Sequence, residues 1–144
     1  GSEKTDVENV ELFGKLASDC RKLGIPVIGE CFPNNSDKLS KEEMHDYVLR
    51  GSRILAEMGA DMIKTFYTYD FKEVVEGCPV PILGLGGKTT DNPMDSLKLA
   101  RQQIKDGAKG VVFGRNAIQR EDPIEYQKSL CKIVKSCDCS GKIL

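Results

Sequence analysis

The sequence predicts an α/β fold in which helices cover a parallel sheet. Four short apolar segments with strand composition are each followed by a segment with helical spacing, and one more helical segment precedes the first strand. A closed (β/α)8 barrel needs about 250 residues, whereas this chain has 144 residues and half of the strands. We therefore expect a parallel (βα)4 half of a TIM barrel with an extra N-terminal helix, or a small open sheet.

The first two elements are a helix and a strand. Thr5 and Glu8 have the spacing of a capping box, which predicts a helix of about 18 residues that ends at Gly24. A strand is expected over 27–32, because this segment is rich in branched apolar residues and the turn-forming residues 33–36 follow it.

The next helix and strand place a lysine in an apolar setting. Ser40 and Glu43 predict a second capping box, with a helix that closes at Gly59. The segment 61–70 then has strand composition, with Lys64 between apolar and β-branched or aromatic neighbours.

The remainder of the chain repeats the strand and helix order. Asp70 is expected to cap a short helix that ends at Gly77. The expected strands, both apolar, are 80–83 and 110–113. The expected helices open with an N-cap residue followed by proline, at Asn92-Pro93 and Asp122-Pro123.

Composition limits the classes of function. The formal net charge is −1 with 30% charged residues of both signs, which argues against nucleic acid or a membrane surface as a partner. The chain contains no long apolar run and opens with no signal peptide, so we expect a cytoplasmic protein. Residues 1–144 are expected to form one domain, with residues 1–2 as a tag remnant and 136–144 as a frayed tail.

The cysteines do not form a typical metal site. Six occur, with no CxxC pair and with His45 as the one histidine of the sequence. We expect all six to be reduced, no metal and no cofactor, although Cys137-Asp138-Cys139 could bind a soft metal or oxidise. His45 lies far in sequence from any strand end, and no role is assigned to it.

Lys64 is the strongest candidate for covalent chemistry. A buried ammonium without a partner is costly, and desolvation favours the neutral amine that attacks a carbonyl to form a Schiff base. The alternative is a lysine at a strand end that reaches solvent along its aliphatic stem.

Two later strand ends have the character of phosphate-binding loops. Gly86 and Gly87 follow the third strand, and Gly114 and Arg115 follow the fourth. Glycines let backbone N–H groups approach an anion, a following helix adds its positive end, and arginine binds phosphate through two donors. Tight turns would also explain the glycines.

Glu30 ends the strand that is expected to lie beside the lysine strand. It could transfer protons as an acid and base, or form a buried ion pair with Lys64. Tyr67 and Tyr69 are alternatives for proton transfer, although packing with a wet hydroxyl is the more common role of such tyrosines. Lys88 could steer a phosphate or be a solvated loop residue.

From Gly59 to about Asp122 the chain resembles the class I, Schiff-base aldolase family that includes archaeal-type fructose-bisphosphate aldolase and autoinducer-2 phosphate thiolase. The resemblance rests on three motifs in order: Ile63-Lys64-Thr65-Phe66-Tyr67, Cys78-Pro79-Val80-Pro81-Ile82 with Gly86-Gly87-Lys88, and Gly114-Arg115-Asn116 with Asp122-Pro123. It implies that Lys64 forms the Schiff base and that Gly86, Gly87, Gly114 and Arg115 hold a substrate phosphate.

The chain departs from the family in two ways. Phe32 stands where fructose-bisphosphate members carry a catalytic tyrosine, and Glu30 instead resembles the glutamate of tagatose-bisphosphate-type aldolases. The resemblance also covers only strands five to eight of the parent barrel, the C-terminal half. The aspartate and second lysine that the family carries on its first strands therefore have no counterpart here.

These observations favour a carbon–carbon lyase, or a thiolase of the same family, acting on a phosphorylated ketose or keto substrate through Lys64. The alternative is an incomplete, non-catalytic phosphate-binding half-barrel; a flavodoxin-like signalling domain would not need these motifs together. Because open sheet edges invite pairing, we expect a homo-oligomer or a complementary N-terminal half-barrel as partner.

Overall fold

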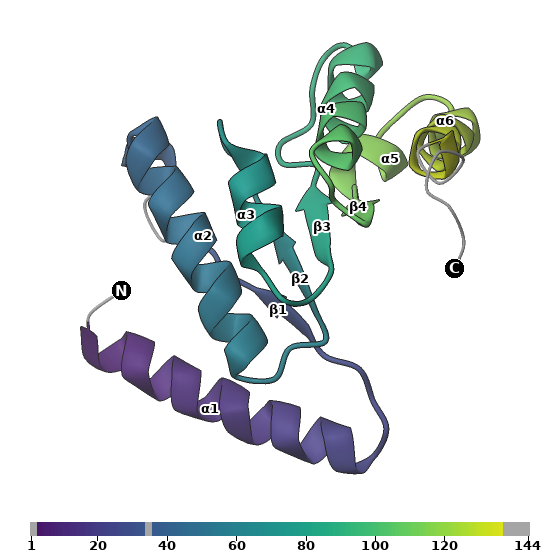
Figure 1. Cartoon of the computed structure of the whole chain (residues 1–144). Helices are drawn as coiled ribbons and strands as arrows, with labels where there is room; N and C mark the ends of the chain where they lie inside the picture. The colour runs from purple at the N-terminus through teal and green to yellow at the C-terminus, as the bar shows by residue number, and fades with distance from the viewer. Residues whose placement is uncertain (1–2, 34–35, 137–144) are drawn as a thin grey trace.

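The computed structural model describes residues 3–33 and 36–136. Its sheet has four parallel strands in the order β1-β2-β3-β4 (Figure 1). The strands are β1 (Ile28–Glu30), β2 (Met62–Thr65), β3 (Ile82–Leu85) and β4 (Gly110–Val112). This arrangement confirms the predicted parallel α/β sheet.

Helices precede and follow the strands. Their bounds are α1 (Glu3–Lys22), α2 (Lys41–Glu57), α3 (Phe71–Gly77), α4 (Pro93–Lys105), α5 (Arg115–Ile118) and α6 (Pro123–Ser136), with a 3₁₀ turn η1 (Ser36–Lys38). The capping box of Ser40 and Glu43 is present on α2, and the Asn92 side chain accepts a hydrogen bond from the Met94 amide at the start of α4. Both predicted helix starts are confirmed.

Several predicted boundaries were wrong. Thr5 lies inside α1 because the helix already begins at Glu3, and Asp70 makes no side-chain cap bond to α3. Strand β3 begins at Ile82, not at residue 80, because Pro81 has no N–H to donate and contributes only its carbonyl, to the Ile63 amide. Ser136 is the last residue of α6, and residues 137–144, the rest of the predicted tail, lie outside the described part.

The two faces of the sheet have different surroundings. On one face, Ile63, Thr65 and Ile82 are buried beneath α2, α3 and α4, which lie together on one side of the sheet (Figure 1). The other face is named the open face here, and its side chains come from alternate positions: Ile28, Glu30, Met62, Lys64, Leu83, Leu85 and Val112. Ile28 is 51% exposed on this face, whereas an isoleucine on a strand inside a hydrophobic core would be buried.

Helix α1 also leaves apolar side chains in contact with solvent. Ala17 is buried, but Val7, Leu12 and Leu16 are more than half exposed, so only one side of α1 packs on the rest of the chain. In the part of the chain that the structure describes, no helix has the length and apolar character to cross a membrane.

Candidate functional site

Lys64 and Glu30 form an ion pair on the open face. They are directly paired positions of β2 and β1, and Lys64 Nζ lies 2.6 Å from Glu30 Oε1. The Lys64 side chain is 26% exposed and the Glu30 side chain is 32% exposed. Lys64 is thus partly buried, between the two alternatives that the sequence left open, and a carbonyl compound can approach the amine from solvent.

The pair provides the two groups that imine chemistry needs. The carboxylate stabilises the ammonium, and at hydrogen-bond distance it can also accept its proton and leave a neutral amine. A purely electrostatic pair would have the same geometry. The predicted proximity of Glu30 and Lys64 is therefore observed, while their catalytic roles remain a prediction.

Of the glycines after β3 and β4, two have structural explanations. A Cβ at Gly86 would lie 2.7 Å from the Phe113 ring, and the Gly86 amide already donates to the Val112 carbonyl. Gly87 has φ of 67°, a left-handed conformation that favours glycine. The Gly86 amide is thus engaged within the fold and is a weaker candidate for binding an anion than the sequence suggested.

Gly114 has no such explanation. Its φ is −80°, and a Cβ there would meet no atom within 4 Å. Neither backbone conformation nor packing within the described chain requires glycine at this exposed position. Close approach of a ligand to the backbone would explain it.

Arg115 joins the two glycine loops. Its Nη2 donates to the Gly87 carbonyl oxygen at 3.2 Å, and the side chain is exposed. A guanidinium has five N–H donors in a planar fork, so this bond leaves donors for an anion. Arg115 therefore links the loop after β4 to the loop after β3, and its role in binding phosphate stays a prediction.

Asn116 and Arg120 hold these loops together and were not predicted as site residues. Asn116 is buried and donates to the carbonyls of Gly86 and Lys88, at 3.0 and 2.9 Å, while its oxygen accepts from Arg120 at 2.8 Å. Arg120 also donates to the Thr90 carbonyl at 2.6 Å. The Gly114-Arg115-Asn116 motif contained the signal for Asn116, whereas only the fold brings Arg120 to the loop.

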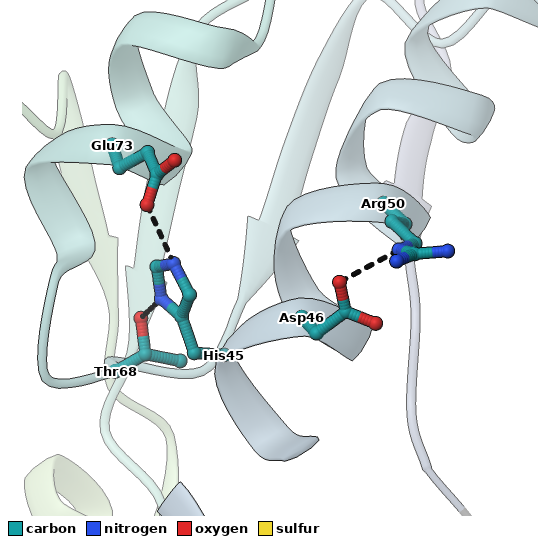
Figure 2. A network of polar contacts seen from close by, with 5 residues as sticks. All are labelled: His45, Asp46, Arg50, Thr68 and Glu73. Atoms are coloured by element: carbon teal, nitrogen blue, oxygen red, sulfur yellow. Dashed lines mark hydrogen bonds and ion pairs between the residues drawn. The ribbon is translucent and has the colours of Figure 1, made fainter. Parts of the chain in front are cut away.

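His45, to which the sequence assigned no role, lies close to the segment that follows the lysine strand. Figure 2 shows its ring between Thr68, which follows β2, and Glu73 of α3. Nδ1 lies 3.0 Å from Thr68 Oγ1 and Nε2 lies 2.9 Å from Glu73 Oε2. The Tyr69 ring packs against the histidine with centroids 4.8 Å apart. Because α2 packs beside β2, this buried histidine fixes the segment that follows Lys64.

The remaining candidates have other partners. The Tyr67 hydroxyl donates to Asp106 Oδ2 at 2.8 Å, and burial together with this carboxylate raises the Tyr67 pKa to about 12. Such a group is a poor proton donor at neutral pH. Lys88 pairs with Asp37 at 3.4 Å, and both side chains are 82% exposed, so this contact contributes little.

The described cysteines are free thiols: Cys20, Cys31, Cys78 and Cys131. Burial raises the pKa of Cys78, which makes it less reactive. Cys137 and Cys139 lie outside the described residues, so the alternatives for that pair remain predictions.

Comparison with known proteins identifies the family. The model of the DeoC/LacD family aldolases matches residues 1–120. The chain belongs to this family. Over 131 residues it is 34% identical to 2-amino-3,7-dideoxy-D-threo-hept-6-ulosonate synthase 1 of Archaeoglobus fulgidus, a match that covers 91% of this chain and 48% of that protein. Over 89 residues it is 43% identical to 3-hydroxy-5-phosphonooxypentane-2,4-dione thiolase of Salmonella paratyphi A, covering 61% of this chain and 30% of the thiolase.

The solved structures agree with this family and with the fold. A Schiff base-forming fructose-1,6-bisphosphate aldolase superposes with a TM-score of 0.81 at 31% identity, over 90% of this chain and 53% of that one. The chain thus spans about half the length of the synthase and of the aldolase, and 30% of the thiolase. The expected aldolase family and half-barrel architecture are confirmed.

Proposed function

We propose that this chain contributes to a class I aldolase-type lyase, or a thiolase of the same family, in which Lys64 forms a Schiff base with a phosphorylated ketose or keto substrate. The observation that carries this proposal is the Glu30–Lys64 pair, 2.6 Å apart on the open face beside two loops that can bind an anion. Family membership supports the same chemistry.

In the proposed mechanism, Glu30 removes a proton from the Lys64 ammonium. The neutral amine attacks the substrate carbonyl, and the carbinolamine loses water to give a protonated imine once Glu30 returns the proton to the departing hydroxyl. Glu30, again a carboxylate, then takes the proton of the substrate's β-hydroxyl group while the carbon–carbon bond breaks. The electron pair of that bond passes to the imine to give an enamine, and the first product leaves as a carbonyl compound. Protonation of the resulting enamine and hydrolysis then release the second product and restore Lys64.

The substrate phosphate is assigned to Gly87, Gly114 and Arg115. Exposed Arg115 lies between the loops after β3 and β4, and the unexplained glycine at 114 keeps its backbone accessible. Gly86 contributes by letting Phe113 pack against the loop, with its own amide already bonded. Asn116 keeps the loop in position.

The proposed site needs a partner. Strands β1 and β4 are the two edges of the sheet, and Ile28 and Val112 at these edges are exposed. We assign the chain to strands five to eight of the barrel, with either a complementary N-terminal half or a second copy of this chain covering the open face. Free cysteines are typical of a reducing compartment, which supports a cytoplasmic location.

The coverage of the relatives also favours a second candidate function. A chain that spans about half of the synthase and of the aldolase, and less of the thiolase, could bind phosphate without completing a turnover cycle. Such a half-barrel would bind anions at the Arg115 loops in a salt-sensitive way and would form no covalent adduct.

Incubation with dihydroxyacetone phosphate and borohydride separates the two candidates. Intact-mass measurement should find a reduced adduct on the wild-type chain and none above background on Lys64→Met. Phosphate binding without a Lys64 adduct would contradict the lyase and support the binding module. Circular dichroism of both chains shows whether the substitution preserves the fold.

A further inference from the structure

Two aromatic side chains extend the open face beyond the Glu30–Lys64 pair. The alternation of side chains continues past the end of β1, because Cys31 faces Gly51 of α2. Phe32, one residue further, therefore lies on the same side of the sheet as Glu30.

The same alternation holds after β2. The Tyr67 hydroxyl bonds to Asp106, directly after α4, and so lies on the helix-covered side with Thr65. Phe66 thus shares the open face with Lys64. Each phenylalanine follows a member of the ion pair by two residues.

The two rings form a fixed pair. Their centroids are 4.8 Å apart with an interplanar angle of 79°, the favourable edge-to-face arrangement. Phe66 is half-buried and packs against the hydrophobic core, while the Tyr47 hydroxyl donates to the Phe32 carbonyl oxygen at 3.2 Å. Phe32 is nevertheless 52% exposed, so the anchored pair presents an apolar surface to solvent.

The position of the Phe32–Phe66 pair places the two rings near one end of a substrate bound at Lys64. Side chains on one face of a strand repeat about every 6.8 Å, so the rings lie one repeat beyond Lys64, toward the carboxyl ends of the strands. Strand β1 is on the opposite side of β2 from the loops after β3 and β4. A substrate held at Lys64 with its phosphate at those loops would place its other end beside Phe32.

We infer that the Phe32–Phe66 pair determines substrate specificity at the proposed Lys64 site, selecting phosphorylated carbonyl compounds whose end remote from the phosphate is apolar, either alkyl or aryl. This inference rests on the proposed function. Phenylalanine rings neither donate nor accept conventional hydrogen bonds. A hydroxyl group at that end of the substrate would therefore lose its hydrogen bonds to water and gain none from the rings. An apolar end gains from burial against the rings.

The test compares 2-butanone with hydroxyacetone. The two ketones have the same number of non-hydrogen atoms, but 2-butanone carries a methyl group where hydroxyacetone carries a hydroxyl group. Each ketone is trapped on the chain with borohydride, and peptide mass spectrometry gives the ketone concentration for half-maximal labelling of Lys64. Phe32→Ser removes the ring, Phe32→Leu keeps an apolar side chain, and Leu16→Ser on α1 removes an apolar group elsewhere that is about as exposed as Phe32, 53% against 52%.

Phe32→Ser should lower the preference for 2-butanone over hydroxyacetone about fourfold, the value of one buried methyl group. Phe32→Leu and Leu16→Ser should keep the wild-type preference. Lys64 labelling with an unchanged preference in Phe32→Ser would overturn the specificity role and leave the proposed function intact. Absence of Lys64 labelling by both ketones and by dihydroxyacetone phosphate would overturn both.

Discussion

The two faces of strand β2 have opposite surroundings. Ile63 and Thr65 are completely buried beneath the helices, whereas Lys64 between them is 26% exposed and paired with Glu30. Because side chains alternate along a strand, four residues supply both a packed core and a reactive surface. Stability and chemistry should therefore respond to different substitutions in the same element.

The glycines of the neighbouring strands and loops show the same division. Gly84 lies against the Gln103 side chain and leaves no room for a Cβ, while Gly114 faces open space. The first glycine is explained by packing on the helix side, and the second is available for a ligand. The contrast separates a structural glycine from a candidate binding glycine.

The largest predicted effect on stability is at Ile63. Ile63→Ala should lower the free energy of unfolding by about 2–5 kcal/mol, because it empties a fully buried position. Ile28→Ala on the open face should cost less than about 1 kcal/mol, because half of that side chain already contacts water. Urea denaturation at several protein concentrations measures both. Equal losses would show that the open face is also covered in solution.

A glycine pair sharpens the comparison. Gly84→Ala should lower stability by about 1–3 kcal/mol, because the new methyl group overlaps the buried Gln103 side chain. Gly114→Ala should leave stability within about 0.5 kcal/mol and weaken phosphate binding. Thermal unfolding and a phosphate titration test the two expectations. Normal phosphate binding by Gly114→Ala would remove Gly114 from the proposed site.

Two threonines near Lys64 should respond in opposite directions. Within the described chain the Thr65 hydroxyl is buried without a hydrogen-bond partner, whereas the Thr68 hydroxyl bonds to His45. Thr65→Val should raise the free energy of unfolding by about 1 kcal/mol, and Thr68→Val should lower it by about as much. Chemical denaturation of the two variants checks the signs. A loss in Thr65→Val would indicate that its hydroxyl has a partner in solution.

Tyr67 gives a smaller, pH-dependent effect on the helix side. Its pKa is raised from 10.0 to about 12, by burial first and by Asp106 second, so the folded state favours the protonated phenol. The resulting stabilisation is complete below pH 10 and is lost as pH rises toward 12. The stability difference between wild type and Tyr67→Phe, about 0.5–1.5 kcal/mol at neutral pH, should therefore shrink over that interval. A constant difference in denaturation experiments would contradict the Tyr67–Asp106 interaction.

Local patterns predicted the fold well. The capping box at Ser40 and the Asn92-Pro93 start involve residues adjacent in sequence, so their spacing was sufficient. The same pattern at Thr5 was misleading because helix-forming residues before it extend α1. The short helix α5 was missed because four residues carry too little periodicity to be recognised.

The candidate site was predicted in part. Strand order made it reasonable to place Glu30 beside Lys64. The glycine motifs indicated Gly86, Gly87, Gly114 and Arg115, but the bond of the Gly86 amide to the Val112 carbonyl could not be seen in the sequence. His45 and Arg120 could not be predicted, because their partners Thr68 and Thr90 lie 23 and 30 residues away and meet them only in the folded chain.

The most direct test of the central claim is the labelling rate of each lysine with dihydroxyacetone phosphate and borohydride, in wild type and in Glu30→Gln. We predict that Lys64 reacts faster than exposed lysines such as Lys72 and Lys98, and that Glu30→Gln slows Lys64 alone by roughly a hundredfold. If Lys64 instead reacts no faster than Lys72 and Lys98, and is unaffected by Glu30→Gln, the pair is only an ion pair and the proposed Schiff-base chemistry is wrong.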